Sequence, residues 1–355
     1  MKLSEDYKCS EKHIGITPRS IMTKGTSTRR KNRLNGSLYG NFDPGDQDKL
    51  MITYERDPEH DYTLNGACGV LYQGNIHFFG GDYTSLPNNY AFERQHFSIE
   101  TQRKGRIVKM TKLKNLNIDF QYPSCSNFEI TSDYFPWSSK NIVILCFKLD
   151  KPKSCYSYDG KLNYIGDSNF GHNGDGLAKY RGKLITVGGD GVSVKTEIME
   201  RKKNGSYIWS KAESDGILSQ YKYMVGKSLV TIPSSDINEE YVLLIGGVAR
   251  SKLISILFDN LISSKVFKFN GTWYNFGKLK KTRKNHNSIY WNGAVYVIGG
   301  NYDNSNFDED IETKIEIWKI NDSPDQFMTS ENWPLLHDWK LPYLFIVPDA
   351  FFPDY

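Results

Sequence analysis

The sequence predicts an all-β fold made of repeated four-stranded units, and three observations support this prediction. A short apolar strand ending in Gly-Gly recurs along the chain, alternating strands follow it, and tight Asn-Gly or Asp-Gly turns join later strands of a unit. A strand that cannot bury its faces alone, repeated at intervals of tens of residues, is typical of a β-propeller. The composition agrees, because 14% of the residues are aromatic and aromatic side chains pack sheets face to face.

The Gly-Gly strand is clearest near the C-terminus, at residues 294–300 (AVYVIGG). The earlier copies with the same ending are 75–81 (NIHFFGG), 183–189 (KLITVGG) and 241–247 (YVLLIGG). A fifth strand, 141–147 (NIVILCF), is equally apolar but has Cys146-Phe147 in place of the glycines. The five strands are spaced around the roughly 50 residues of a propeller blade that carries loop insertions. They predict five blades.

Tight hairpins occupy matching places in three of these units. Asn270-Gly271 lies between two strands in residues 264–273, and Asn204-Gly205 separates residues 196–200 from 207–209. Asp159-Gly160 follows a comparable strand in the second unit. Because both turn residues need positive φ, such dipeptides are the strongest short signal for a hairpin.

The last two units and the third resemble the kelch-repeat family, whose motif couples a Gly-Gly strand to a later Tyr and Trp. The residues that carry the resemblance in the last unit are 282–286 (TRKNH), Tyr290, 291–293 (WNG), Gly299, Gly300, Trp318 and Trp333. The resemblance covers most of residues 60–340. It is weaker in the first unit, which lacks a Trp, and weakest in the second, which lacks the glycines. It implies a kelch-type β-propeller domain over residues 34–355.

A sixth blade is predicted from the two ends of the propeller domain. Residues 339–347 (WKLPYLFIV) are typical of an inner strand, and residues 50–54 (LMITY) of an outer strand without a blade of its own. Pairing them closes the ring and removes exposed sheet edges. We therefore expect six blades, with five or seven as alternatives, and a monomer, since a closed ring hides its edges.

Residues 1–33 form an arm of a different kind, with nine Lys or Arg residues against three acidic ones. The whole chain carries +4, so the propeller is nearly neutral and the arm holds the excess. We expect a disordered, solvated arm. The basic run at residues 29–33 (RRKNR) leaves two alternatives open: a nuclear localisation signal, or a patch that binds nucleic acid or an acidic membrane. Beyond this arm, nucleic-acid binding is not expected.

The sequence as written predicts a cytoplasmic protein. Residues 1–33 contain no apolar leader, and apolar runs stop at about seven residues, whereas a membrane span needs roughly 20. An incomplete N-terminus would instead allow secretion. Two features keep that alternative open: the five cysteines and four Asn-x-Ser/Thr sequons, which begin at Asn35, Asn204, Asn270 and Asn321.

The cysteines allow two interpretations. Cys146 and Cys155 fall on successive strands of the second unit, where the missing glycines leave room for a disulfide. Buried free thiols are the favoured alternative, because Cys is often a small core residue. The sequons at Asn204 and Asn270 coincide with hairpin turns, which already explain their Asn-Gly dipeptides.

The sequence assigns no catalytic residue, metal site or cofactor. The seven histidines are scattered without zinc spacing, and no P-loop or nucleophile elbow is present. The copper enzymes among kelch-like propellers need a Tyr, Cys and His constellation, which the sequence does not assemble. Residues 171–176 (GHNGDG) are interpreted as a loop between blades. The acidic stretch 303–312 offers oxygen ligands for Ca²⁺ without their ordered spacing, so a solvated loop is expected there.

The resemblance implies function at one mouth of the ring, where the loops that lead into each first strand gather and commonly contact partners. Arg283 and His286 hold those positions in the fifth unit, and His172 and Asp175 lie in the equivalent segment of the third. Either these residues bind a protein partner, or they only tie neighbouring blades together.

We predict a non-enzymatic interaction or adaptor module that binds a protein of unknown identity. The alternative is an enzyme or lectin-like binder that acts on a sugar or small molecule in the central channel. Its candidate acid and base groups are Glu197, Asp175 and His172, which are scattered along the sequence.

Overall fold

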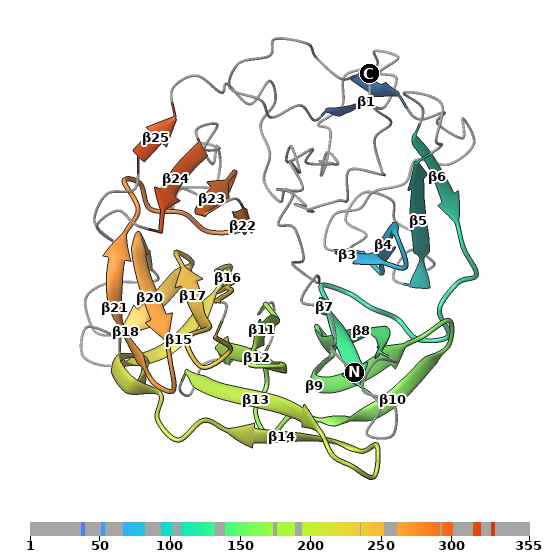
Figure 1. The fold of residues 1–355 in the computed structure, drawn as a ribbon, viewed down its shortest axis with the longest axis horizontal. Helices are drawn as coiled ribbons and strands as arrows, with labels where there is room; N and C mark the ends of the chain where they lie inside the picture. The colour runs from blue at the N-terminus through green and yellow to red at the C-terminus, as the bar shows by residue number, and fades with distance from the viewer. Residues whose placement is uncertain are drawn as a thin grey trace, which may run out of the picture.

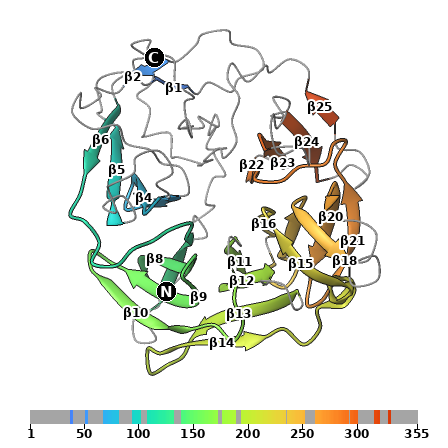
Figure 2. The same ribbon diagram turned by 180° about the vertical axis from the view of Figure 1, so that it is seen from behind.

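The computed structural model describes residues 37–39, 51–53, 67–81, 94–101, 108–131, 139–172, 176–188, 194–234, 236–251, 261–291, 293–300, 315–320 and 328–330. These residues form five four-stranded antiparallel sheets, arranged around a common centre as the blades of a β-propeller (Figures 1 and 2). Four strands of each blade run from the centre outward in chain order. The predicted all-β propeller is confirmed.

The strands of the five blades have the following bounds. Blade 1 is β3 (Cys68–Tyr72), β4 (Asn75–Phe79), β5 (His96–Thr101) and β6 (Val108–Lys112). Blade 2 is β7 (Ser124–Thr131), β8 (Ser139–Lys148), β9 (Lys151–Tyr158) and β10 (Leu162–Asp167). Blade 3 is β11 (Ala178–Tyr180), β12 (Lys183–Gly188), β13 (Lys195–Arg201) and β14 (Tyr207–Lys211). Blade 4 is β16 (Ser228–Ile232), β17 (Tyr241–Ile245), β20 (Lys265–Phe269) and β21 (Trp273–Lys278). Blade 5 is β22 (Asn287–Trp291), β23 (Ala294–Ile298), β24 (Ile315–Lys319) and β25 (Met328–Ser330).

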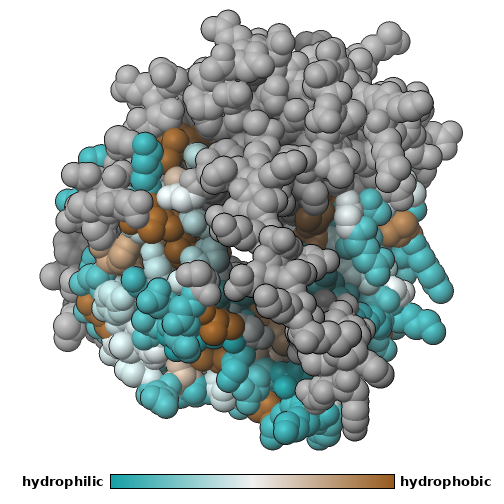
Figure 3. Space-filling model, viewed as in Figure 1, coloured by the Kyte–Doolittle hydropathy of each residue, from teal (hydrophilic) through white to brown (hydrophobic). Residues whose placement is uncertain are grey.

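The second strand of a blade buries both of its faces. In β17, Val242 and Leu244 join the cluster shared with blade 3, whereas Leu243 and Ile245 join the cluster shared with blade 5. Because side chains alternate along a strand, a strand between two neighbours must be apolar at every position. This explains why the repeated strand reads as a continuous apolar run. On the face seen in Figure 3, hydrophilic side chains accordingly cover most of the described blades, and hydrophobic ones form small groups.

In blades 1, 4 and 5 the glycine that follows the second strand adopts a left-handed backbone, and in blades 1 and 4 it packs closely against the segment that enters the next blade. Gly80, Gly246 and Gly299 have φ of 71°, 60° and 70°. In blade 2 the corresponding residue is Phe147, with φ of 63°, at a break in the register between β8 and β9. The geometry of blade 2 is therefore kept without glycine, and Phe147 is fully buried.

The three predicted hairpins are confirmed, but the positive φ expected at both turn residues is found only at the glycine of each dipeptide, not at Asp159, Asn204 or Asn270. Gly160, Gly205 and Gly271 have positive φ, and each lies between the third and fourth strands of its blade. A three-stranded sheet that sequence analysis missed adds to blade 4: β15 (Tyr221–Val225), β18 (Val248–Ser251) and β19 (Leu261–Ile262). β15 and the short 3-10 helix Gly216–Gln220 lie in the connection between blades 3 and 4.

The predicted sixth blade is described only at its N-terminal side. Within residues 50–54, Met51–Thr53 form β2, which pairs antiparallel with β1 (Ser37–Tyr39). The C-terminal partner predicted at residues 339–347 lies outside the described residues, as does the arm at 1–33. Five blades are thus established, and the sixth stays a prediction. No helix among the described residues is long and apolar enough to cross a membrane.

Two disulfides link strands of blades 1 and 2. Cys146 and Cys155 are paired across β8 and β9, with Cα atoms 4.1 Å apart, so the favoured prediction of free thiols is wrong for this pair. Cys68 and Cys125 join the inner strands β3 and β7 of neighbouring blades, with Cα atoms 5.8 Å apart. The second bridge was not predicted, because its cysteines are 57 residues apart in sequence.

Replacing Gly80 with Ala is expected to destabilise the fold more than replacing Gly74. Both residues have positive φ, but a Cβ at Gly80 would lie 2.0 Å from the carbonyl oxygen of Phe120, whereas a Cβ at Gly74 has no heavy atom within 4 Å. Backbone strain alone costs about 1 to 2 kcal/mol, and strain with overpacking about 2 to 5 kcal/mol. Urea unfolding of Gly74→Ala and Gly80→Ala measures the difference. Equal losses would contradict the close contact between blades 1 and 2.

Candidate functional site

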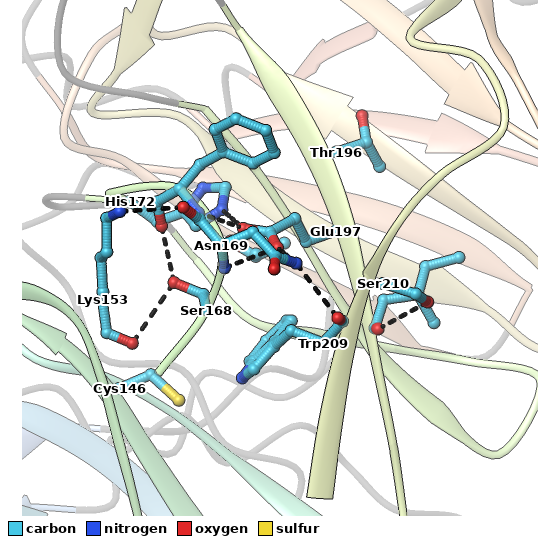
Figure 4. A network of polar contacts seen from close by, with 12 residues as sticks. Cys146, Lys153, Ser168, Asn169, His172, Thr196, Glu197, Trp209 and Ser210 are labelled. Atoms are coloured by element: carbon cyan, nitrogen blue, oxygen red, sulfur yellow. Dashed lines mark hydrogen bonds and ion pairs between the residues drawn. The ribbon is translucent and has the colours of Figure 1, made fainter. Parts of the chain in front are cut away.

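In blade 3, a buried carboxylate holds the loop that leads into the first strand of the blade. Glu197 lies on β13 with no exposed surface. Its carboxylate accepts hydrogen bonds from the main-chain N–H groups of Asn169 (2.9 Å) and Phe170 (3.0 Å) and from Nδ2 of Asn169 (2.6 Å). It also lies 2.8 Å from Nε2 of His172 (Figure 4). Four contacts from one loop thus converge on one side chain.

These contacts keep the Glu197 carboxylate ionised. Burial alone would raise the pKa of Glu197, but the hydrogen bonds from His172, Phe170 and Asn169 outweigh it, so that pKa lies below its ordinary value. Nδ2 of Asn169 also donates to the carbonyl oxygen of Trp209, 3.0 Å away on β14. The loop is therefore fixed to both outer strands of the blade.

Blade 5 repeats the same arrangement with an arginine. Glu316 on β24 accepts hydrogen bonds from the main-chain N–H groups of Lys280 (2.6 Å) and Lys281 (3.3 Å). Nε and Nη2 of Arg283 donate to its Oε1 at 3.1 and 3.0 Å. Nη1 of Arg283 donates to the carbonyl oxygen of Gly299 at 3.0 Å. Both charged side chains are fully buried.

The two glutamates occupy the same position in their blades. Each pairs with the residue two positions before the first glycine of the Gly-Gly segment, Thr186 for Glu197 and Val297 for Glu316. The donors follow the same spacing, because Asn169, Phe170 and His172 match Lys280, Lys281 and Arg283 in turn. We call each set a loop anchor. The matching positions in blades 1, 2 and 4 hold Phe97, Tyr156 and Phe267.

His286 links the inner strands of blades 4 and 5. Its Nε2 lies 2.9 Å from Oγ of Ser228 on β16, and that hydroxyl lies 2.8 Å from Oγ of Ser288 on β22. Burial, together with the nearby positive charge of Arg283, lowers the pKa of His286 to about 3. The imidazole is therefore neutral at physiological pH and acts as a hydrogen-bonding group of the core.

The structure places the sequence-predicted residues at separate positions in blades 3 and 5 rather than at one site. Arg283 and His172 hold equivalent positions in two anchors, as the predicted equivalence of their segments implied. Arg283 and His172 have no exposed surface, and His286 is only 6% exposed. Asp175 lies outside the described residues. Direct binding of a partner by these side chains stays a prediction.

Sequence analysis missed Glu316 and named Glu197 only as a scattered acidic residue. A usable signal was present: each glutamate stands in an alternating strand that follows the Gly-Gly segment and pairs with a fully buried residue of the Gly-Gly strand, Thr186 or Val297. A charge placed at a buried position needs a partner, which points to the lead-in loop of the same blade.

A second buried polar pair lies in blade 1. Nδ1 of His77 on β4 lies 2.8 Å from Nε2 of His96 on β5, and the exposed fractions of the two residues are 7% and 2%. Phe79 stacks on His96, and Tyr158 of blade 2 meets it edge-on. Burial lowers the pKa of His77 to about 4 and, with the neighbouring His77, that of His96 to about 3.

Among the residues that the structure describes, no group of three or more His, Cys, Asp or Glu side chains is placed to hold a metal ion. No protein-family model matches the chain, and no curated protein sequence is similar to it.

Removing the arginine of the blade 5 anchor is expected to cost about 3 to 5 kcal/mol of stability, because Arg283→Met leaves the Glu316 carboxylate buried without its cation. Lys183→Met is the matched control, since it breaks the exposed ion pair of Lys183 with Glu200. That change should cost less than about 1 kcal/mol. Denaturant midpoints of the two variants give the comparison. Similar small losses in both would contradict a stabilising role for the anchor.

The buried histidine pair is expected to make the fold sensitive to acid. In the unfolded chain these imidazoles titrate near 6.5, whereas in the fold their pKa values are about 4 and about 3. Below pH 6.5 the unfolded state therefore binds protons before the folded state does. The free energy of unfolding then decreases as the pH is lowered, by about 1.4 kcal/mol per pH unit for each imidazole that stays neutral in the fold.

Urea unfolding measured between about pH 7.5 and about pH 5 tests this expectation. The variant His77→Gln/His96→Gln should lose less stability over that interval than the natural chain. An identical pH dependence in the two proteins would exclude the pair as its source.

Proposed function

We propose that this chain is a kelch-type propeller that binds a protein partner, without catalysis, through the loops held by the two anchors. The observation that carries the proposal is the repetition of the anchor in blades 3 and 5, each built from the same three loop positions and a fully buried glutamate. Fixed loops bind with a smaller loss of conformational entropy than mobile ones.

The loops that lead into the blades and the Gly-Gly segments meet at one end of the ring, which we call the anchor mouth. The N–H of Gly81 donates to the carbonyl oxygen of Phe120, and the N–H of Gly247 donates to that of Arg283. Each bond joins a Gly-Gly segment to the loop that enters the next blade. These segments thus support one another as a platform for a partner.

Exposed residues of the anchored loops are the proposed contacts. Lys280 and Lys281 bind Glu316 through their main-chain N–H groups, and both residues are exposed. Their ammonium groups are therefore presented on a fixed backbone. The buried side chains of Arg283, His172 and His286 would contribute by holding such loops. The proposal thus keeps the mouth predicted from the sequence as the binding surface, but assigns the partner contacts to exposed lysines.

The enzyme alternative is weakened by the same contacts. Of its three candidate groups, Glu197 and His172 are both fully buried and bonded to each other within an anchor. Acid and base groups that serve a substrate must reach it. The engagement of these two residues in the fold therefore favours the binding module.

The two disulfides indicate the kind of cellular compartment in which the chain folds. Stable disulfides form in oxidising environments and are rare in the cytosol. With two of them in blades 1 and 2, we propose that the chain folds in an oxidising compartment, the alternative to the cytoplasmic location expected from the N-terminal residues.

Capture of partners from the source cells tests the binding proposal. The full-length chain should retain a specific protein, and Lys280→Ala/Lys281→Ala should weaken that retention by about tenfold or more, as loss of contacts worth about 1.4 kcal/mol predicts. Lys202→Ala/Lys203→Ala is the matched control, because it removes two exposed lysines from the β13–β14 turn. The control should bind like the natural chain.

Unchanged binding by Lys280→Ala/Lys281→Ala, with loss in the control, would place the contact at the hairpins instead and overturn the proposal. A chain that starts at Leu34 separates a partner of the propeller from one held by the basic arm. Equal thermal unfolding of the two double variants shows that a binding loss is local.

A further inference from the structure

Two of the four sequons lie at the tips of matching hairpins. Asn204-Gly205-Ser206 forms the turn between β13 and β14, and Asn270-Gly271-Thr272 forms the turn between β20 and β21. Both asparagines are exposed. The sequence pattern alone explains these residues as turns. Their exposure and contacts show in addition that the asparagine side chains are accessible for modification.

The carboxamide of Asn204 is held by its oxygen. Oδ1 accepts hydrogen bonds from the main-chain N–H of Ser206 at 3.0 Å and from Oγ of Ser206 at 2.7 Å. Oδ1 of Asn270 likewise accepts a hydrogen bond from the guanidinium of Arg181. Within the described part of the chain, no hydrogen bond engages Nδ2, the side-chain amide nitrogen, of either residue. Both nitrogens are thus available at the surface, where an attached sugar displaces no packing.

The two hairpins lie on one face of the ring. Arg181, in the turn between β11 and β12, donates to Asn270 and to the carbonyl oxygen of Asn238 in the loop between β16 and β17. Turns after first strands and turns after third strands therefore share this side, which we call the hairpin face. It is opposite to the anchor mouth, because antiparallel strands alternate between the two ends.

The disulfides provide a second, independent observation. The compartments in which disulfides persist include the one in which Asn-x-Ser/Thr sequons receive carbohydrate. Cys68–Cys125 joins two blades and Cys146–Cys155 joins two strands of one blade, so both belong to the folded propeller.

We propose that Asn204 and Asn270 each carry an N-linked glycan. In the transfer, the amide nitrogen bonds to the anomeric carbon of an oligosaccharide linked to a lipid pyrophosphate. The bond from that carbon to the pyrophosphate oxygen breaks, the lipid pyrophosphate leaves with the electron pair, and the amide loses one proton. The glycans cover the hairpin face in blades 3 and 4 and leave the anchor mouth open.

The full-length protein, isolated from the cells that make it, is digested to peptides and treated with peptide N-glycosidase in heavy-oxygen water. Asn204 and Asn270 should each become Asp with one heavy oxygen, and the intact peptides should carry hexose and N-acetylhexosamine masses. A parallel digestion without glycosidase is essential, because Asn-Gly sequences also deamidate spontaneously. Asn163, an exposed asparagine outside any sequon, is the internal control.

Matched variants separate modification from folding. Ser206→Ala and Thr272→Ala should each lose the glycan of their own hairpin, whereas Ser206→Thr and Thr272→Ser should keep it. Heavy oxygen at both asparagines that depends on the glycosidase supports the proposal. If both asparagines are unmodified, the proposal is overturned, whether the cysteines are bridged or free. If only one asparagine carries a glycan, the assignment of the other is overturned. Because partner capture is measured separately, neither result decides the proposed function.

Discussion

The second strand of each blade has apolar side chains on both faces, and only neighbouring blades can cover them. The alternation in β17, with Val242 and Leu244 toward one neighbour and Leu243 and Ile245 toward the other, shows why no blade is stable alone. Each blade needs a flanking sheet on both sides, and the clusters shared between neighbouring blades supply this to blades 2, 3 and 4. The left-handed residues after these strands then bring the chain back close to the next blade.

The loop anchors have a different role: they hold irregular backbone in place at the end of a sheet. Loop N–H groups that leave water need acceptors. Glu197 and Glu316 each satisfy two of them and gain a cationic or imidazole partner from the same loop. In blades 1, 2 and 4 the same position holds an aromatic side chain. At this position of the blade, a charge is therefore buried in the two blades whose loop supplies the donors.

Local patterns allowed most of the fold to be predicted, because their causes lie within a few residues. Gly-Gly strands and Asn-Gly turns are examples, since periodicity and positive φ are properties of short segments. The anchor of blade 5 and the bridge of Cys68 with Cys125 could not be predicted this way. Their partners are distant in sequence. Packing within blade 5 decides whether Arg283 meets Glu316, and packing between blades 1 and 2 decides whether the two cysteines meet. Arg283 and His172 were identified by position, but their burial was not, because a charged residue in a loop usually faces water.

The bridge between Cys68 and Cys125 also makes the ring asymmetric along the chain. It closes a loop of 57 residues and is expected to restrict the unfolded chain by about 4 kcal/mol of entropy. Blades 1 and 2 therefore behave as one covalent unit. A pull on the N-terminal side cannot peel the first blade from the second, since the force passes through the sulfur atoms into β7. Blades 3 to 5 have no such link in the described chain, so a pull on one of them is opposed only by non-covalent contacts with its neighbours.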